Sequence, residues 1–261
     1  MSGFETEVDG REEPTRTRAA SNSVEAVRPS SAAIGKTLVV GVLIALAGAW
    51  IASTLADRFR IMENVEVGRK VRGEFQGTRL VIGNAAQNAA VAYALLGANL
   101  SLSLAITAGF FSQRFSWTRI LTAGLGAIAL GGLFGAVSSY AVTPIYFNRL
   151  DTADFTLSIL IHLAIWCAVG AAAGVAFGIG CGTRKAFAGS LVGAITGGAL
   201  AALIFDVCGA FLPLARTERP LAEEASTRLV AAALLCVFVV LGTVIVALQE
   251  PRSAQKKPDR R

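Results

Sequence analysis

Six long runs of hydrophobic residues, separated by polar connections, form the main pattern of this sequence. The runs cover 33–56, 87–111, 120–142, 157–180, 188–214 and 228–248. At about 1.5 Å per residue, each run is long enough as a helix to cross a hydrocarbon core of about 30 Å. Lipid offers no partners to backbone polar groups, so such runs form helices. The pattern therefore predicts an all-α fold: a polytopic integral membrane helical bundle with a six-span membrane domain over 33–248.

Polar segments flank and interrupt this domain. Residues 1–32 are rich in Glu, Arg, Ser and Thr, which predicts a disordered cytoplasmic tail, and residues 249–261 form a basic C-terminal tail. The longest connection, 57–80, mixes basic and acidic residues without a clear period. A solvated segment on lipid head groups is the favoured interpretation of that connection, and helix and short hairpin both stay open.

Composition narrows the class further. Hydrophobic residues make up 54% of the chain and charged residues only 16%, which is atypical of a soluble globule and favours a lipid bilayer as the partner. The net charge of +6 does not predict nucleic-acid binding, because the basic residues lie in tails and connections. Lys and Arg number 14 on the two tails and even connections and 10 on the odd connections. The positive-inside rule therefore places both termini in the cytoplasm.

Glycine recurs every four residues along the fourth and fifth spans. The fourth span contains Gly170, Gly174 and Gly178, and the fifth contains Gly189, Gly193 and Gly197. The two rows are equidistant from the turn between them, so Gly178 mirrors Gly189 and Gly174 mirrors Gly193. Small residues at this spacing let membrane helices approach closely, which predicts that the two rows pack against each other. Gly131 and Gly135 indicate similar packing of the third span. Whether each partner lies within this chain or in another copy stays open.

Two ionisable residues inside the spans, His162 and Asp206, form a candidate polar pair. They lie equally far from the turn between the fourth and fifth spans, and an intramembrane ionisable residue suggests function. At about 100° per residue, however, both side chains point away from the glycine rows. Helical phase therefore favours separate environments, with His162 in the interfacial zone near Trp166. A direct pair is the alternative.

The second span carries a polar face formed by Asn84, Asn88, Asn99 and Ser103. Unpaired amides in hydrocarbon are costly, so this face should contact other helices or water. It is the candidate lining of a pathway.

Sequence motifs argue against most catalytic chemistry. One histidine cannot form an H-E-x-x-H zinc site, no cysteine has a ligand-spaced partner, and no phosphate-binding glycine loop precedes a helix. We therefore predict no catalytic residues, no metal and no cofactor.

The last two spans resemble a known family. The run from Gly189 through Gly193 to Gly197-Gly198, the segment Leu203-Ile-Phe-Asp206, and a final span that opens at Arg228 and closes with Leu248-Gln249-Glu250 carry the similarity. Over about 170–250 the chain is similar to a glycine-rich multispanning module of bacterial membrane proteins, some of which continue into a forkhead-associated domain. Eleven residues follow Glu250, so that phosphopeptide-binding domain is not expected here. The resemblance implies a bacterial inner membrane and cytoplasmic tails.

Three functional hypotheses follow. The first is a non-enzymatic helical bundle, packed through glycine rows, that assembles with itself or with partner membrane helices. The alternative is a channel or transporter for ions or small solutes, lined by the polar face of the second span with His162 and Asp206. The third, an intramembrane enzyme using Ser139 or Asp206, has the least support.

Overall fold

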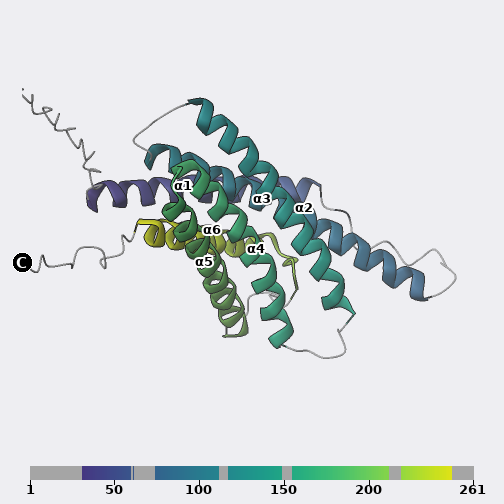
Figure 1. Cartoon of the computed structure of the whole chain (residues 1–261). Coiled ribbons are helices and arrows are strands. Elements are labelled where there is room, and N and C mark those ends of the chain that lie inside the picture. The colour runs from purple at the N-terminus through teal and green to yellow at the C-terminus, as the bar shows by residue number, and fades with distance from the viewer. Residues whose placement is uncertain are drawn as a thin grey trace, which may run out of the picture.

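Six α-helices make up nearly all of the part of the chain that the computed structural model describes, which is residues 31–59, 61, 74–111, 117–148, 155–211 and 219–248. The helices are α1 (Ser31–Arg58), α2 (Glu74–Phe111), α3 (Trp117–Phe147), α4 (Phe155–Cys181), α5 (Arg184–Phe211) and α6 (Ala225–Leu248) (Figure 1). Each contains an apolar segment long enough to cross a membrane. The prediction of an all-α membrane bundle with six spans is therefore confirmed.

The predicted tails lie mostly outside the described residues. This holds for 1–30 and for 249–261, and also for 62–73 within the long first connection. Residues 31 and 32, assigned to the tail by the sequence pattern, belong to α1.

Two helix boundaries differ by five residues or more from those predicted. The membrane-length segment of α2 begins at Leu80 instead of 87. Near this start, the polar side chain of Asn88 is satisfied within the fold. Its amide accepts a hydrogen bond from the Ile61 N–H and donates one to the Ile61 carbonyl, both at 2.8 Å. The third helix continues past 142 through Pro144. A proline this near the helix end removes only one hydrogen bond, and the Asn148 N–H resumes the pattern on the Pro144 carbonyl.

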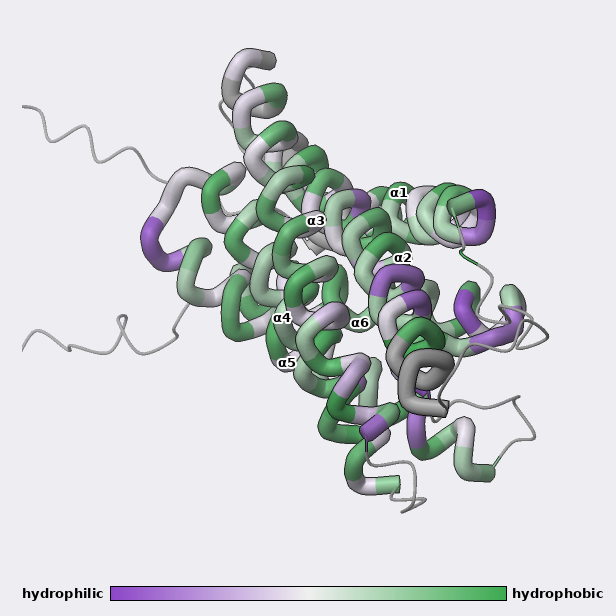
Figure 2. The backbone as a smooth tube through the Cα atoms, turned by 90° about the vertical axis from the view of Figure 1, so that its right-hand side faces the viewer, coloured by the Kyte–Doolittle hydropathy of each residue, from purple (hydrophilic) through white to green (hydrophobic). Residues whose placement is uncertain are grey.

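Helix α4 occupies the centre of the bundle. It contacts α2, α3, α5 and α6, while the first and last helices, α1 and α6, lie side by side (Figure 1). Hydrophobic residues dominate all six helices (Figure 2). Large apolar side chains also point outward on the peripheral helices α1 and α3, for example Trp50 and Leu125. Outward apolar surface of this kind is what a helix presents to lipid.

The glycine row of α4 packs on α5. A Cβ added to Gly174 would lie 2.7 Å from the Ser190 carbonyl oxygen and 2.8 Å from Ala194 Cβ, and Gly170 is equally close to the Ala194 carbonyl. The Ser190 hydroxyl donates a hydrogen bond of 2.9 Å to the Gly174 carbonyl. These contacts bring the two backbones together where only a hydrogen atom fits between them.

The glycine row of α5 packs on a different helix, and this corrects the mirrored pairing expected from the sequence. A Cβ on Gly193 would collide with the Gly242 carbonyl of α6, and a Cβ on Gly242 would collide with the Gly193 carbonyl. Gly197 is equally close to Phe238, and Gly189 lies against Ala247. The residues of α5 that face α4 are Ser190, Ala194 and Gly198, each one position after a glycine of the row. Consecutive residues on a helix point about 100° apart, so the two rows lie on different faces of α5. One face of α5 therefore meets α4 and the adjacent face meets α6.

Helix α3 also packs closely against α2 through glycines. A Cβ on Gly131 would collide with the Gly97 carbonyl and a Cβ on Gly135 with the Tyr93 carbonyl. Every glycine predicted to mediate helix packing thus has its close neighbour within this chain. The rows consequently give no support to self-association, which stays a prediction.

A glycine also forms the turn that joins α4 to α5. Gly182 adopts a positive φ of 70°, and its N–H donates to the Gly178 carbonyl, an arrangement typical of a helix C-cap. Thr183 then caps α5, because its hydroxyl accepts a hydrogen bond from the Ala186 N–H. This tight turn makes α4 and α5 antiparallel neighbours.

The glycine contacts predict the effect of larger side chains. Gly174→Leu should disrupt the α4–α5 interface and Gly193→Leu the α5–α6 interface, each lowering stability by roughly 1–3 kcal/mol or more through overpacking. The measurement is the thermal unfolding midpoint of the purified protein in detergent. Gly126→Leu is the matched control, since nothing lies within 4 Å of a Cβ added there. Midpoints for the first two variants equal to that of the control would contradict this packing.

Candidate functional site

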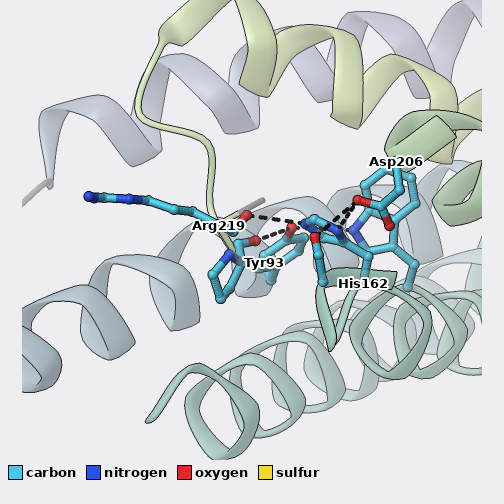
Figure 3. Close-up of polar contacts among 7 residues, drawn as sticks. Tyr93, His162, Asp206 and Arg219 are labelled. Carbon is cyan, nitrogen blue, oxygen red and sulfur yellow. Dashed lines mark hydrogen bonds and ion pairs between the residues drawn. The ribbon is translucent and has the colours of Figure 1, made fainter. Parts of the chain in front are cut away.

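Buried polar side chains gather at one end of the bundle, where α1, α3 and α5 end and α2, α4 and α6 begin. Residues 219–224, which immediately precede α6 and are named here the cap connection, cross this capped end. The side chains that meet there come from α2, α4 and α5, and Figure 3 shows them converging beneath the cap connection.

His162 and Asp206 form a direct contact at the centre of this cluster. The His162 Nδ1 lies 2.8 Å from the Asp206 Oδ1, and the Ser158 hydroxyl donates to the same oxygen at 3.2 Å. All three residues are 1–2% exposed. The second carboxylate oxygen of Asp206 is buried without a hydrogen-bond partner. The site is therefore an acid–base pair almost fully removed from solvent.

The phase argument that favoured separate environments is wrong, and the reason lies in the rows that pack. On α4 the contact row has a spacing of four and consists of Ser158, His162, Trp166, Gly170, Gly174 and Gly178. On α5 it consists of Ser190, Ala194, Gly198, Ala202 and Asp206. Ridges of residues four apart are those that interdigitate when helices cross, and such ridges run obliquely over the helix surface. The glycine row of α4 therefore leads to His162, and the row beside the α5 glycines leads to Asp206.

Aromatic side chains surround the pair. The His162 ring centroid lies 5.4 Å from that of Phe205, in an edge-to-face arrangement, and 5.8 Å from that of Trp166. The Trp166 indole N–H donates to the Tyr93 hydroxyl at 3.3 Å. These rings pack around the imidazole and restrict its orientation.

Three side chains bind the backbone of the cap connection. The Tyr93 hydroxyl donates to the Pro220 carbonyl at 2.8 Å, and His162 Nε2 lies 3.2 Å from the Arg219 carbonyl oxygen (Figure 3). The Arg228 guanidinium donates to the carbonyls of Ala222, at 2.9 Å, and Glu223. Four carbonyls of one short segment are thus held by α2, α4 and α6.

Arg228 also ties the cap connection to the first helix. Its Nη2 contacts the Asp57 carboxylate at the end of α1, and its side chain is almost completely buried. A buried guanidinium is tolerated only with such partners. The Asp57–Arg228 ion pair therefore joins the end of α1 to the start of α6.

A cavity of about 40 Å³ lies beneath the cap connection. Alanines of α1 and α6 and the rings of Tyr93, Trp166 and Phe205 form much of its wall, and the polar residues Ser53, His162 and Arg228 also line it. Sites for drug-sized ligands measure about 300–1,000 Å³, so this space is suited to a few atoms at most.

The predicted polar face of α2 is engaged in helix packing. Asn88 binds the Ile61 backbone, and the Ser103 hydroxyl donates to the carbonyl of Asn99 on its own helix. Asn99 lies directly against Gly48 of α1, where a Cβ would collide with it, and its amide nitrogen is buried without a partner. Asn84 is half-buried. Asn99 thus meets α1, and Asn88 meets Ile61, which follows α1.

Sequence reasoning missed four contributors to the site: Tyr93, Arg228, Asp57 and the cap connection. The pairing of Arg228 with Asp57 could have been predicted from the sequence. In a six-span bundle the start of the last span and the end of the first span lie at the same end, and these two residues have opposite charges there. Tyr93 is the one tyrosine of α2, within an otherwise alanine- and leucine-rich stretch. Nothing in the pattern of 219–224 indicates that its carbonyls accept side-chain hydrogen bonds.

Comparison with protein-family models, curated proteins and solved structures found no match to this chain. The resemblance of 170–250 to the glycine-rich bacterial module therefore stays a prediction, and function is argued from the site alone.

The contact between His162 and Asp206 predicts strong coupling between the two positions. His162→Ala and Asp206→Ala should each destabilise the fold, because each leaves a buried polar partner unmatched, while the double variant should lose less than the sum of the two. The expected coupling is about 1–3 kcal/mol, measured by a double-mutant cycle on reversible unfolding in mixed detergent. Additive losses would show that the two side chains do not interact.

Proposed function

We propose that this protein is a non-enzymatic multi-pass membrane protein whose role depends on its rigid bundle and not on solute passage. The main support is the state of the α2 polar face. The Asn88 amide is hydrogen-bonded to the Ile61 backbone, and the Asn99 side chain packs against Gly48 of α1. Both side chains therefore contribute to contacts within the protein. A pathway would instead need them to face a shared water-filled space.

The candidate nucleophiles support the non-enzymatic part of the proposal. The Ser139 hydroxyl donates to the Gly135 carbonyl of its own helix at 2.7 Å, and Ser158 donates to Asp206. Both nitrogens of His162 are already engaged by Asp206 and Arg219. An activated serine requires a base within hydrogen-bond reach, and the Ser139 hydroxyl is instead bound to a backbone carbonyl of its own helix.

Transport of ions or small solutes is the second candidate. One observation favours it: a buried ionisable pair, with one carboxylate oxygen unpartnered, beside a cavity at one end of the bundle. Intramembrane ionisable residues often mark ion or proton pathways.

Flux through reconstituted vesicles separates the two candidates. If the bundle is structural, vesicles containing the wild type should release ions and small neutral solutes no faster than empty vesicles. Asn99→Leu and Asp206→Asn should match the wild type, and Gly126→Ala serves as the control for reconstitution. Flux that depends on the wild-type protein and is lost in Asn99→Leu would favour the transport hypothesis.

The proposal includes an orientation. The distribution of Lys and Arg supports cytoplasmic termini, and the resemblance of 170–250 to a bacterial module supports a bacterial inner membrane. In this orientation the capped end faces outward. A reporter that is active only in the cytoplasm should therefore be active when fused to the C-terminus and inactive when inserted in the first connection. The reverse pattern would overturn this orientation.

A further inference from the structure

The two nitrogens of the His162 ring both face hydrogen-bond acceptors. Nδ1 lies 2.8 Å from the Asp206 carboxylate and Nε2 lies 3.2 Å from the Arg219 carbonyl oxygen. A carbonyl oxygen can only accept, and so can an ionised carboxylate. Each contact is a hydrogen bond only when a proton lies between the ring nitrogen and the oxygen, so the two contacts together need two protons.

Counting protons shows what this geometry requires. A neutral imidazole has one N–H, so next to an ionised Asp206 one of the two contacts would set a ring lone pair against an oxygen lone pair. One additional proton removes the conflict. Either an imidazolium donates to both oxygens, or a protonated Asp206 donates to Nδ1 while the Nε2–H donates to Arg219. In both cases the pair is neutral overall.

Burial strengthens this requirement. His162 and Asp206 are each 1% exposed, and loss of the proton would leave a net negative charge in a site enclosed by aromatic rings. An uncompensated buried charge is far more costly than a neutral pair.

Among the residues that the structure describes, the groups around the pair do not supply a free counter-charge. At the capped end, the described titratable and charged side chains of the neighbouring elements are Tyr93 of α2, Tyr140 and Tyr146 of α3, Asp57 and Arg58 of α1, Arg228 of α6, and Arg219, Glu223 and Glu224 of the cap connection. Arg58 and Glu224 are exposed. The Arg228 charge is matched by Asp57, and Arg219 pairs with Glu223. The Arg219 side chain also extends away from the imidazole (Figure 3). The proton of the pair is therefore the group that neutralises Asp206.

We propose that His162 and Asp206 form a proton-binding site that latches the cap connection onto the bundle, so that loss of the bound proton releases it. The cap connection is held by Tyr93, His162 and Arg228. A tyrosine hydroxyl and a guanidinium keep their protons across the physiological range, whereas the donor at Nε2 disappears with the proton. Because Pro220, Leu221 and Ala222 form part of the cavity wall, release of the latch opens the cavity at the capped end.

The chain contains one histidine, which makes the proton directly observable. Nitrogen NMR of protein labelled with ¹⁵N-histidine, purified without a histidine tag, reports only His162. At neutral pH Nε2 should carry a proton, and it should lose that proton as the pH is raised. An Nε2 that is unprotonated at neutral pH would overturn the proposal.

Hydrogen–deuterium exchange of the cap connection tests the mechanical consequence. After correction for the intrinsic effect of pH, amides of 219–224 in the wild type should exchange about tenfold faster once the proton is lost, since one hydrogen bond to a charged group is removed. In Asp206→Asn the amide can donate to Nδ1, which leaves the Nε2–H bound to Arg219 without an extra proton. In this variant the exchange rate of 219–224 should not increase with pH beyond the intrinsic effect, and the cap connection should stay bound to the bundle at alkaline pH. The pH-dependent increase seen in the wild type is called the pH step.

Tyr93→Phe is the matched control. It removes the neighbouring bond to Pro220 without changing the titrating pair, so it should speed exchange at every pH and retain the step. An identical step in the wild type and Asp206→Asn would overturn the latch. Should Asp206→Asn fail to fold, the nitrogen signals of the wild type decide the question by themselves.

Discussion

Close backbone contact between α4 and α5 is the interaction on which the rest of this structure depends. Lipid supplies no hydrophobic force between helices, so association relies on dispersion contacts and interhelical hydrogen bonds. Gly170 and Gly174 allow that approach, and the Ser190 hydroxyl reinforces it by donating to the Gly174 carbonyl. The same two rows continue to His162 and Asp206, so the packing that holds the helices together also places the acid–base pair.

The second close interface, between α5 and α6, has a consequence for the capped end. Reciprocal contact of Gly193 with Gly242 positions α6, and α6 in turn carries Arg228 to the cap connection. Asp57 then holds the end of α1 to the same arginine. Glycine packing in the middle of the bundle and hydrogen bonding at its end are therefore parts of one arrangement. A substitution deep in the α5–α6 interface would therefore shift Arg228 and weaken its hydrogen bonds to the cap connection.

The capped end satisfies polar groups that would otherwise be costly in an apolar environment. Carbonyls of the cap connection accept hydrogen bonds from Tyr93 and Arg228, and the Ile61 backbone binds Asn88. Non-helical backbone at membrane depth is tolerated only when protein or water satisfies it in this way. Within the part of the chain that the structure describes, three side-chain atoms are exceptions: the Asp206 Oδ2, the Asn99 Nδ2 and the Ser101 Oγ are buried without partners. The first of these belongs to the pair that we assign to proton binding.

The hydropathy pattern by itself determined the class of fold, the number of spans and the residues with unusual chemistry. Length and hydrophobicity decide whether a helix can cross a membrane, and a lone His or Asp in an apolar run is visible without a structure. Which faces meet was decided only in three dimensions. Consecutive residues on a helix point about 100° apart, so Gly197 faces α6 whereas Gly198 faces Trp166 on α4, although the sequence shows simply two adjacent glycines. The mirrored spacing could not reveal this difference. The partners of His162 and Arg228 likewise come from carbonyls of 219–224, and a backbone carbonyl leaves no mark in the amino-acid sequence.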